Sequence, residues 1–177
     1  NDLALHLDGA RLWNALVAKN ETPKQYGETF DSISICLSKG LGCPVGSVLL
    51  GKKDLIKKAR RIRKVFGGGM RQAGIIAAAG TYALKNNIER LKHDHEHAKQ
   101  MGNVIAKTPI SKSVLPVETN IVIFETVEST TAAIVVEKLK QKGILCSITA
   151  PDRVRLVMHL DITEEMVTKT VEIIKAI

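Results

Sequence analysis

Strand-like and helix-like patterns of apolar residues alternate along the chain, which predicts an α/β fold. An apolar run that ends at Asp8 predicts a first strand, and apolar residues that alternate with polar ones predict a second strand over 33–37. A third strand is expected over 45–50. Because its connection to the second strand is too short for a parallel crossover, the third strand should be antiparallel or lie at the sheet edge.

Helical spacing of apolar or alanine residues predicts four helices in the first part of the chain. They are expected over 11–19, 52–65, 72–85 and 88–106. The polar stretch 20–30 contains a proline and a glycine, so we expect a loop or a brief helical turn there.

The pattern changes near residue 108, where prolines and serines mark a linker. We therefore expect one domain over 1–108 and a smaller α/β domain over 109–177. The smaller domain should contain strands over 120–124, 144–148 and 153–157 and helices over 130–142 and 163–177. Thr163 precedes two acidic residues at the start of the last helix and is its expected N-cap.

Lys39 lies between the strand expected over 33–37 and a loop, 40–46, that contains three glycines and a proline. Such a loop holds the lysine at a strand end rather than on a helix surface. A lysine beside an apolar wall loses proton affinity, and its free amine can attack a carbonyl, as Schiff-base lysines do. Taken alone, the pattern still favours an ordinary solvated lysine in a turn.

Asp8 adds a second feature, because it ends the first apolar run and is followed by Arg11. Ligand-binding groups of an open α/β sheet gather beyond the carboxyl ends of its strands, so Asp8 and Lys39 should share one rim. A carboxylate against a pyridine nitrogen keeps that nitrogen protonated, which makes the ring an electron sink. His6 shares a strand face with Asp8, and we expect it to hydrogen-bond Asp8 rather than act as a catalytic base.

Two charged stretches suggest other functions that we do not favour. Eight lysines and arginines over 52–64 explain much of the net charge of +8, but only 3% of the residues are aromatic and no nucleic-acid-binding motif is present. We expect a solvated helix face or an interface with an acidic partner subunit, and no nucleic-acid binding. His93 and His97 have the spacing of helical zinc ligands, but His95 points away, so we expect an exposed polar face and no metal site.

The overall composition sets modest limits on the class of protein. Hydrophobic residues make up 45% of the chain and charged residues 25%, as in an ordinary soluble protein. No apolar run is long enough to cross a membrane, so no membrane partner is expected. Cys36, Cys43 and Cys146 are widely spaced without a CxxC pair, which fits reduced thiols and a cytoplasmic location.

Three segments of the chain carry a specific resemblance to one enzyme family. They are HLDGARLWNA (6–15), CLSKGLGCPVGSVLLG (36–51) and RKVFGGGMRQAG (63–74). Together they resemble the low-specificity L-threonine aldolases, pyridoxal-5'-phosphate enzymes of the aspartate-aminotransferase-like fold. The resemblance runs in order to the RLVMH near the end and covers essentially the whole chain. It implies the C-terminal part of a fold-type I large domain, followed by the small α/β domain.

The resemblance also implies roles around the cofactor, pyridoxal 5'-phosphate. Lys39 would form the Schiff base with it, and Asp8 would contact its pyridine nitrogen. Arg11 would orient the substrate carboxylate or the cofactor ring. Arg71 would help to hold the cofactor phosphate at the mouth of the active site.

Two further residues are implied to bind the substrate. Lys64 would lie beside Arg71 at the active-site mouth. Arg155 would bind the α-carboxylate of the amino acid, for which a guanidinium fork is well suited. The strand pattern around Arg155 by itself favours a side chain that simply faces water.

The implied activity is cleavage of L-threonine or L-allo-threonine to glycine and acetaldehyde by a homo-oligomer, a tetramer in the family. A lysine–aspartate pair also serves β-eliminating lyases and aminotransferases, and a non-catalytic truncated or accessory form is a further alternative. The chain does not begin with methionine, and in the family a long segment precedes this point. That segment supplies the phosphate cup, a ring-stacking histidine and part of the substrate site. We therefore expect a C-terminal portion that is inactive alone.

Overall fold

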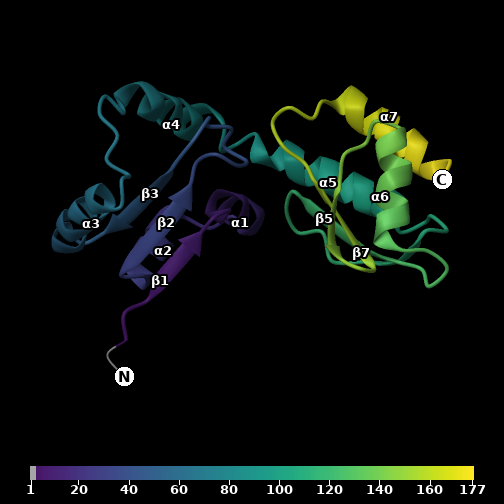
Figure 1. Ribbon diagram of the computed structural model, residues 1–177, viewed down its shortest axis with the longest axis horizontal. Coiled ribbons are helices and arrows are strands. Elements are labelled where there is room, and N and C mark those ends of the chain that lie inside the picture. Colours follow the sequence, from purple (N-terminus) through teal and green to yellow (C-terminus); the bar gives the residue numbers. More distant parts are fainter. Residues whose placement is uncertain (1–2) are drawn as a thin grey trace. The chain divides into compact units, whose positions relative to one another are not determined.

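The structure, a computed structural model, describes residues 3–177, which form two compact units (Figure 1). The first unit ends at Arg90 and the second spans Leu91–Ile177. The boundary expected after residue 108 is therefore too late. The reason is that α5 (Leu91–Ile105) packs on β5 (Ile121–Thr126) and α7 (Glu164–Lys175) of the second unit. The α/β class is confirmed in both units.

A three-stranded sheet forms the centre of the first unit. Its strands are β1 (His6–Gly9), β2 (Ser32–Cys36) and β3 (Ser47–Gly51), in the order β1-β2-β3. β1 and β2 are parallel, and β3 is antiparallel to β2. The antiparallel direction expected for the third strand is confirmed.

Leu12 and Leu16 of α1 (Leu12–Lys19) pack on Ile33 and Ile35 of β2 to form the core of this unit. The apolar side chains of β2 and α1 have the periods of two and of three to four that the sequence predicted, so these elements fold as expected. The helices α3 (Lys53–Val65) and α4 (Gly74–Asn86) also lie within two residues of their expected bounds.

The stretch 20–30 contains α2 (Pro23–Thr29), which realises the helical alternative of its prediction. Thr22 and Gln25 form a capping box in which the Thr22 backbone N–H donates to Gln25 Oε1 at 2.7 Å. Pro23, at the first helical position, has no N–H, so the helix start has one unpaired donor fewer. These signals at the N-terminus allow a helix of seven residues in a polar stretch.

The second unit is built on a four-stranded antiparallel sheet in the order β4-β5-β7-β6. The sheet pairs β4 (Ser111–Val114) with β5, β5 with β7 (Arg153–Val157), and β7 with β6 (Ser147–Ala150). The polar strand β4 was expected as a linker, because its sequence has no apolar alternation and only its pairing with β5 makes it a strand.

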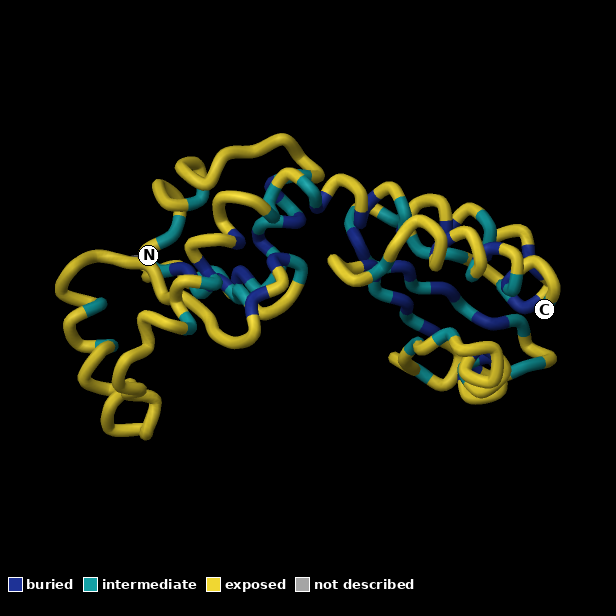
Figure 2. The backbone as a smooth tube through the Cα atoms, turned by 90° about the horizontal axis from the view of Figure 1, so that it is seen from above, coloured by how far each residue is buried: buried dark blue, intermediate teal, exposed yellow. Residues whose placement is uncertain are grey.

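One face of this sheet carries the core of the second unit. Val122, Phe124, Val154 and Leu156 are at most 4% exposed and pack with buried residues of α5, α6 (Ala132–Gln141) and α7. The alternating residues Ile121, Ile123, Arg155 and Val157 point to the other face and are only partly buried. Figure 2 shows the resulting alternation of buried and intermediate segments along these strands. We call this second side the open face.

The expected N-cap of α7 is confirmed, because Thr163 Oγ1 accepts a hydrogen bond from the Met166 backbone N–H at 3.2 Å. The prediction that 93–97 form an exposed polar face is wrong for part of this stretch. His93 is exposed, but Asp94 and His95 are only 0% and 6% exposed. The helical period of α5 places them on the same side as Leu91 and Ala98, which are fully buried.

Residues 3–177 contain neither a candidate metal site nor a helix that could span a membrane. Within this range no three His, Cys, Asp or Glu side chains are grouped so that they could hold a metal ion. Helices in the same range are too short or too polar to cross a membrane.

Candidate active site

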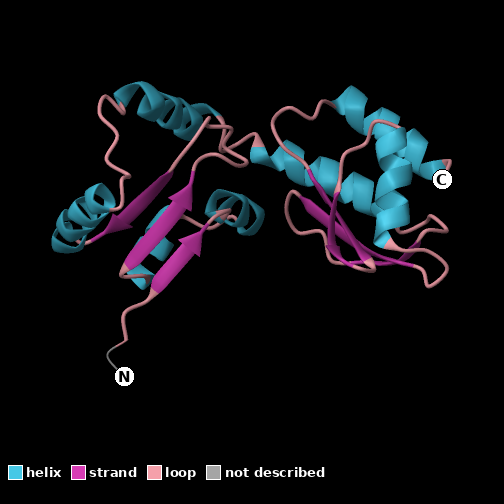
Figure 3. Ribbon diagram, viewed as in Figure 1, coloured by secondary structure: helices cyan, strands magenta, loops and turns pink. Residues whose placement is uncertain are grey.

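Asp8 and Lys39 lie at the same edge of the first sheet. Asp8 is the third residue of β1 and pairs with Ser34 of β2. Lys39 follows three residues after Cys36, the last residue of β2. Because β1 and β2 are adjacent and parallel, as their arrowheads in Figure 3 show, both residues come at the carboxyl ends of neighbouring strands.

Three backbone hydrogen bonds shape the loop that carries Lys39. The N–H of Gly42 donates to the Lys39 carbonyl at 2.8 Å, and the N–H of Cys43 donates to the Leu37 carbonyl at 3.1 Å. The N–H of Leu37 donates to the Gly46 carbonyl at 3.0 Å, which closes the loop at its base. Gly42 and Gly46 have φ values of 74° and 113°, which side chains disfavour, so glycine is needed at both positions.

The Lys39 loop is also fixed to the rest of the first unit. Leu41 and Cys43 are buried at 2% and 7% exposure. Asn87, which follows α4, donates through Nδ2 to the Leu41 carbonyl at 2.8 Å. The side chain of Lys39 itself is exposed. The apolar wall expected beside its ammonium group is therefore not supplied by the part of the chain that the structure describes.

The hydrogen bond that we expected between His6 and Asp8 is replaced by one between His6 and Ser32. Asp8 is exposed, and its Oδ1 accepts from the backbone N–H of Ala10 at 3.2 Å. His6 does share the strand face of Asp8, but its Nδ1 lies 2.8 Å from Ser32 Oγ across the strand pair. His6 pairs with Ser32 because the two residues are directly opposite in the register of β1 and β2.

Arg11 lies close to Asp8 in the chain and caps the start of α1. It is the N-cap residue, it is half-buried, and its carbonyl accepts from the Ala15 backbone N–H at 3.2 Å. This position is on the segment that leaves the carboxyl end of β1, as the sequence predicted.

Lys64 and Arg71 flank the three-glycine loop between α3 and α4. The loop folds back on α3, because Gly68 N–H donates to the Arg63 carbonyl at 2.8 Å. A Cβ built on Gly69 would lie 3.4 Å from Lys64 Cγ. Lys64 and Arg71 are both exposed. Among the residues that the structure describes, no hydrogen bond or ion pair joins either of them to Lys39 or Asp8.

Arg155 lies in the second unit, on the open face of its sheet. It pairs with Ile123 of β5 and with Ser147 of β6. The residue is half-buried, and its Nε is buried without a hydrogen-bond partner. The burial of Nε shows that this part of the guanidinium does not face water, whereas the role of the whole side chain stays a prediction.

Two charged residues near Arg155 were not singled out in the sequence. Glu125 Oε1 accepts from Arg153 through Nε at 3.1 Å and through Nη2 at 2.7 Å. Hydrogen bonds from Arg153 and then from Ser113 hold the pKa of Glu125 below its ordinary value. Opposite charges on two strands with alternating patterns are compatible with such an ion pair, but the sequence does not give the strand register that places Glu125 opposite Arg153.

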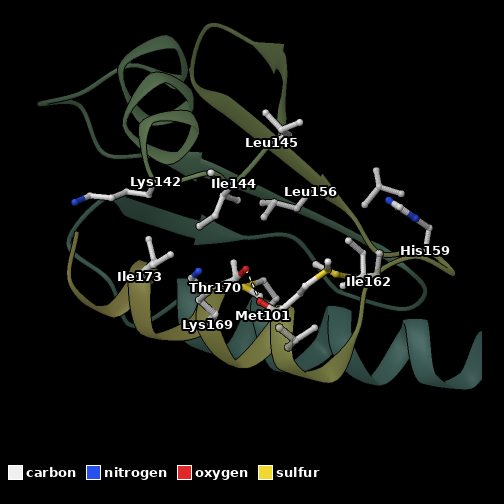
Figure 4. A pocket seen from close by; sticks show the side chains of 15 residues that line it. Met101, Lys142, Ile144, Leu145, Leu156, His159, Ile162, Lys169, Thr170 and Ile173 are labelled. Carbon is white, nitrogen blue, oxygen red and sulfur yellow. Dashed lines mark hydrogen bonds between the residues drawn. The ribbon is translucent and has the colours of Figure 1, made fainter.

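A pocket of about 450 Å³ lies in the second unit. Figure 4 shows its largely apolar walls, which come from α5, α7 and the connection after α6. Thr170 on its wall donates to the Met166 carbonyl of its own helix at 2.7 Å. None of Lys39, Asp8, Arg11, Arg71, Lys64 and Arg155 lines it.

Comparison with known proteins gives relatives over nearly the whole chain. A low specificity L-threonine aldolase from Escherichia coli O157:H7 is 48% identical over 168 residues, which are 95% of this chain and 49% of that protein. Low-specificity L-threonine aldolase 1 from Arabidopsis thaliana is 41% identical over 162 residues, 90% of this chain and 45% of its own length. The chain thus spans about half the length of these curated relatives.

The fold also matches solved structures. A protein from Exiguobacterium sp. 255-15, provisionally assigned to the aromatic amino acid beta-eliminating lyases and threonine aldolases, has a TM-score of 0.79 at 23% identity. The match covers 98% of this chain and 52% of that one. The ornithine aminotransferase of Toxoplasma gondii matches with a TM-score of 0.68 at 17% identity, over 99% of this chain and 44% of its own. These likenesses confirm the fold that the sequence predicted, that of the pyridoxal-phosphate enzymes of fold type I.

The family assignment rests on the sequence profile of the family described as beta-eliminating lyase. This profile matches residues 1–129, a range that includes β1, β2 and the Lys39 loop. Because that is well over half of the 177 residues, the chain belongs to the beta-eliminating lyase family.

Proposed function

We propose that this chain carries the cofactor-binding lysine of a pyridoxal-5'-phosphate-dependent lyase that cleaves L-threonine or L-allo-threonine to glycine and acetaldehyde. The observation that carries the proposal is the placement of Asp8 and Lys39 at the carboxyl ends of adjacent parallel strands. The names of the E. coli and Arabidopsis relatives support the reaction and the substrate.

Side chains of the first unit fit the chemical groups of the cofactor. Its aldehyde needs an accessible primary amine, and the exposed Lys39 offers one on a loop that hydrogen bonds hold in shape. Its pyridine nitrogen needs a carboxylate, and Asp8 is exposed on the neighbouring strand. Its phosphate needs cationic donors, and Arg71 is an exposed guanidinium in the same unit.

When bound, the cofactor supplies an electron sink for the cleavage of a bond at the α-carbon of the amino acid. The chain's own residues would position the reacting groups and keep the pyridine nitrogen protonated. Lys39 would hold the cofactor through its primary amine. Asp8 would keep a proton on the pyridine nitrogen, because a carboxylate there stabilises the positive charge.

Arg155 would bind the carboxylate of the amino acid. Its Nε–H is buried and has no acceptor in the part of the chain that the structure describes, which leaves a donor ready for a ligand. Two parallel N–H groups of a guanidinium match the two oxygens of a carboxylate. Arg11 would orient the same carboxylate or the cofactor ring, and Lys64 would bind substrate at the site mouth.

A second candidate reaction is β-elimination, which the family description itself favours. The same lysine and aspartate serve both reactions, since each begins by labilising a bond at the α-carbon. L-Threonine distinguishes them by its products. Aldol cleavage gives glycine and acetaldehyde, whereas elimination of the β-hydroxyl gives 2-oxobutanoate and ammonia.

The finer properties of the assembly are also part of the proposal. We infer a homo-oligomer, with a tetramer as its form, located in the cytoplasm. Apolar side chains at the end of α3 and on α4 support association, because Val65, Phe66 and Ile75 are 75%, 84% and 84% exposed.

The experiment is product analysis with L-threonine and with L-allo-threonine, using the cofactor-loaded complete enzyme that contains this chain. We expect equal amounts of glycine and acetaldehyde, and none from the Lys39→Ala variant. Formation of 2-oxobutanoate and ammonia would show that the reaction is β-elimination rather than aldol cleavage. A complete enzyme that turns over neither substrate, even when the cofactor is in excess, would contradict the proposal.

A further inference from the structure

Glu125, Arg153 and Arg155 form a charged group on the open face of the second sheet. In the register of β5 and β7, Glu125 lies opposite Arg153, and Ile123 lies opposite Arg155. Glu125 is therefore the diagonal neighbour of Arg155. Diagonal positions on one sheet face are within reach of long side chains, and an arginine is among the longest.

Both carboxylate oxygens of Glu125 are occupied by other groups. Arg153 donates two hydrogen bonds to Oε1, and the hydroxyl of Ser113 on β4 donates to Oε2 at 3.1 Å. These bonds stabilise the ionised form of Glu125, so its pKa is lowered and it remains an anion at neutral pH. The two oxygens of the anion are thus bound by groups other than Arg155.

Arg155 has no such partner. Its Nε is buried and makes no hydrogen bond, and the ion pairs of the described residues do not include it. A buried donor without an acceptor costs free energy, so a carboxylate within reach would be expected to bind it. Glu125 is that carboxylate, and it is held by Arg153 instead.

We propose that Arg153 is a positioning residue, which holds Glu125 so that the guanidinium of Arg155 stays open for a ligand carboxylate. The inference rests on the role of Arg155 in the proposed function and goes beyond it by assigning Arg153 and Glu125. Without Arg153, Glu125 turns toward Arg155 and competes with the amino acid. Specificity here depends on removing an internal competitor as well as on supplying a donor.

A purely structural role for the Arg153–Glu125 pair gives a different expectation. The Arg153 side chain is 47% exposed and the Glu125 side chain 23% exposed, and pairs near the surface contribute little to folding. If the pair only joined β5 to β7, its loss would lower the stability of the fold slightly and leave the anion affinity of Arg155 unchanged.

The experiment uses the 177-residue chain labelled with ¹⁵N and acetate as the probe, at constant ionic strength. The Nε–H signal of Arg155 is identified by its loss in Arg155→Lys. We expect this signal to shift with acetate until it saturates in the wild type. In Arg153→Met we expect about threefold to tenfold weaker acetate binding, the range that one charge pair of this kind supports. Adding Glu125→Gln to this variant should restore the wild-type affinity.

Each outcome decides the inference. Glu125→Gln alone removes the competitor and should bind acetate at least as tightly as the wild type, which tests the idea if Arg153→Met fails to fold. Wild-type affinity in Arg153→Met, or weaker binding in Glu125→Gln, overturns the role of Arg153 and leaves that of Arg155 intact. If the wild-type Arg155 signal does not shift with acetate, the roles of Arg153 and Arg155 are both overturned. The role of Lys39 is tested separately by the threonine products.

Discussion

Gly9 and Ser34 approach one another so closely that a Cβ added to Gly9 would lie 2.7 Å from the Ser34 carbonyl oxygen. The same Cβ would lie 3.3 Å from Cβ of Leu12 at the start of α1. β1 and β2 therefore meet tightly at the end that carries Asp8, and only glycine fits there without moving the backbone.

We expect Gly9→Ala to lower the free energy of unfolding by about 1–3 kcal/mol, because the methyl group overpacks a site bounded by backbone. Urea unfolding followed by circular dichroism measures the change. Gly27→Ala is the control, since nothing lies within 4 Å of a Cβ at that position in α2. Alanine is the better helix former, so Gly27→Ala should unfold at the same or slightly higher urea concentration. Equal stability of Gly9→Ala and the wild type would refute the close approach.

Lys39 should be the lysine that forms a covalent bond with pyridoxal phosphate. Borohydride reduction of the cofactor-loaded protein, followed by peptide mapping, should find the pyridoxyl group on the peptide that contains Lys39. The absorbance band of the bound cofactor, at about 420 nm, should disappear on reduction. Lys52→Ala, an exposed lysine before α3, is the control and should label normally. A label mainly on another lysine contradicts the assignment.

In the complete enzyme that contains this chain, Asp8→Asn should keep the fold but reduce turnover of L-threonine by about a hundredfold or more, as expected when a group that holds a proton in place is lost. The neutral amide keeps the size of Asp8 and its hydrogen bond from Ala10, but it does not stabilise a protonated pyridine nitrogen. Asp31→Asn is the matched control, because Asp31 is an exposed carboxylate that accepts from the Leu5 backbone N–H at 2.9 Å. Near-normal turnover in Asp8→Asn would show that the negative charge of Asp8 is not needed for the reaction.

The predicted elements and their order were largely right because apolar periodicity is a local property of the sequence. The edge that joins Asp8 to Lys39 was also predictable, since it requires only two parallel strands. The strand β4 was not, because its polar sequence pairs only in the presence of β5. Nor was the burial of Asp94, which depends on the side of α5 that faces the core. The Arg153–Glu125 pair depends on a register that no single strand specifies.

His95 should make the stability of the fold depend on pH. Burial holds its pKa below the ordinary value of 6.5, so the unfolded chain binds a proton more readily than the folded one. The free energy of unfolding is therefore unaffected by His95 above pH 6.5, and it decreases as the pH falls below that value, because the unfolded chain takes up the proton first.

Unfolding free energies measured between about pH 5 and pH 8 should fall less steeply toward acid in His95→Gln than in the wild type. His93→Gln, an exposed histidine on the same helix with a 71% exposed side chain, is the control. It should follow the wild-type slope closely. Identical slopes in all three proteins would show that His95 does not contribute.

Asn87 should matter to Lys39 although it lies 48 residues away in the chain. Its Nδ2 donates to the Leu41 carbonyl inside the Lys39 loop, and Leu41 is 2% exposed. Asn87→Ala leaves that carbonyl without this donor, which should cost about 0.5–1.5 kcal/mol of folding free energy. The loop that presents Lys39 should then be less ordered, so pyridoxal phosphate should bind more weakly and label Lys39 more slowly.

Asn86→Ala separates this effect from a general change at the end of α4. Asn86 is exposed and donates to the Tyr82 carbonyl of its own helix at 2.8 Å, so its loss does not touch the loop. Cofactor titration and the rate of borohydride-trapped labelling compare the two variants. We expect Asn87→Ala to reduce both and Asn86→Ala to match the wild type. If the two variants bind and label alike, the Lys39 loop is held by its own backbone bonds and its glycines, and the anchor from α4 has no part in presenting the lysine.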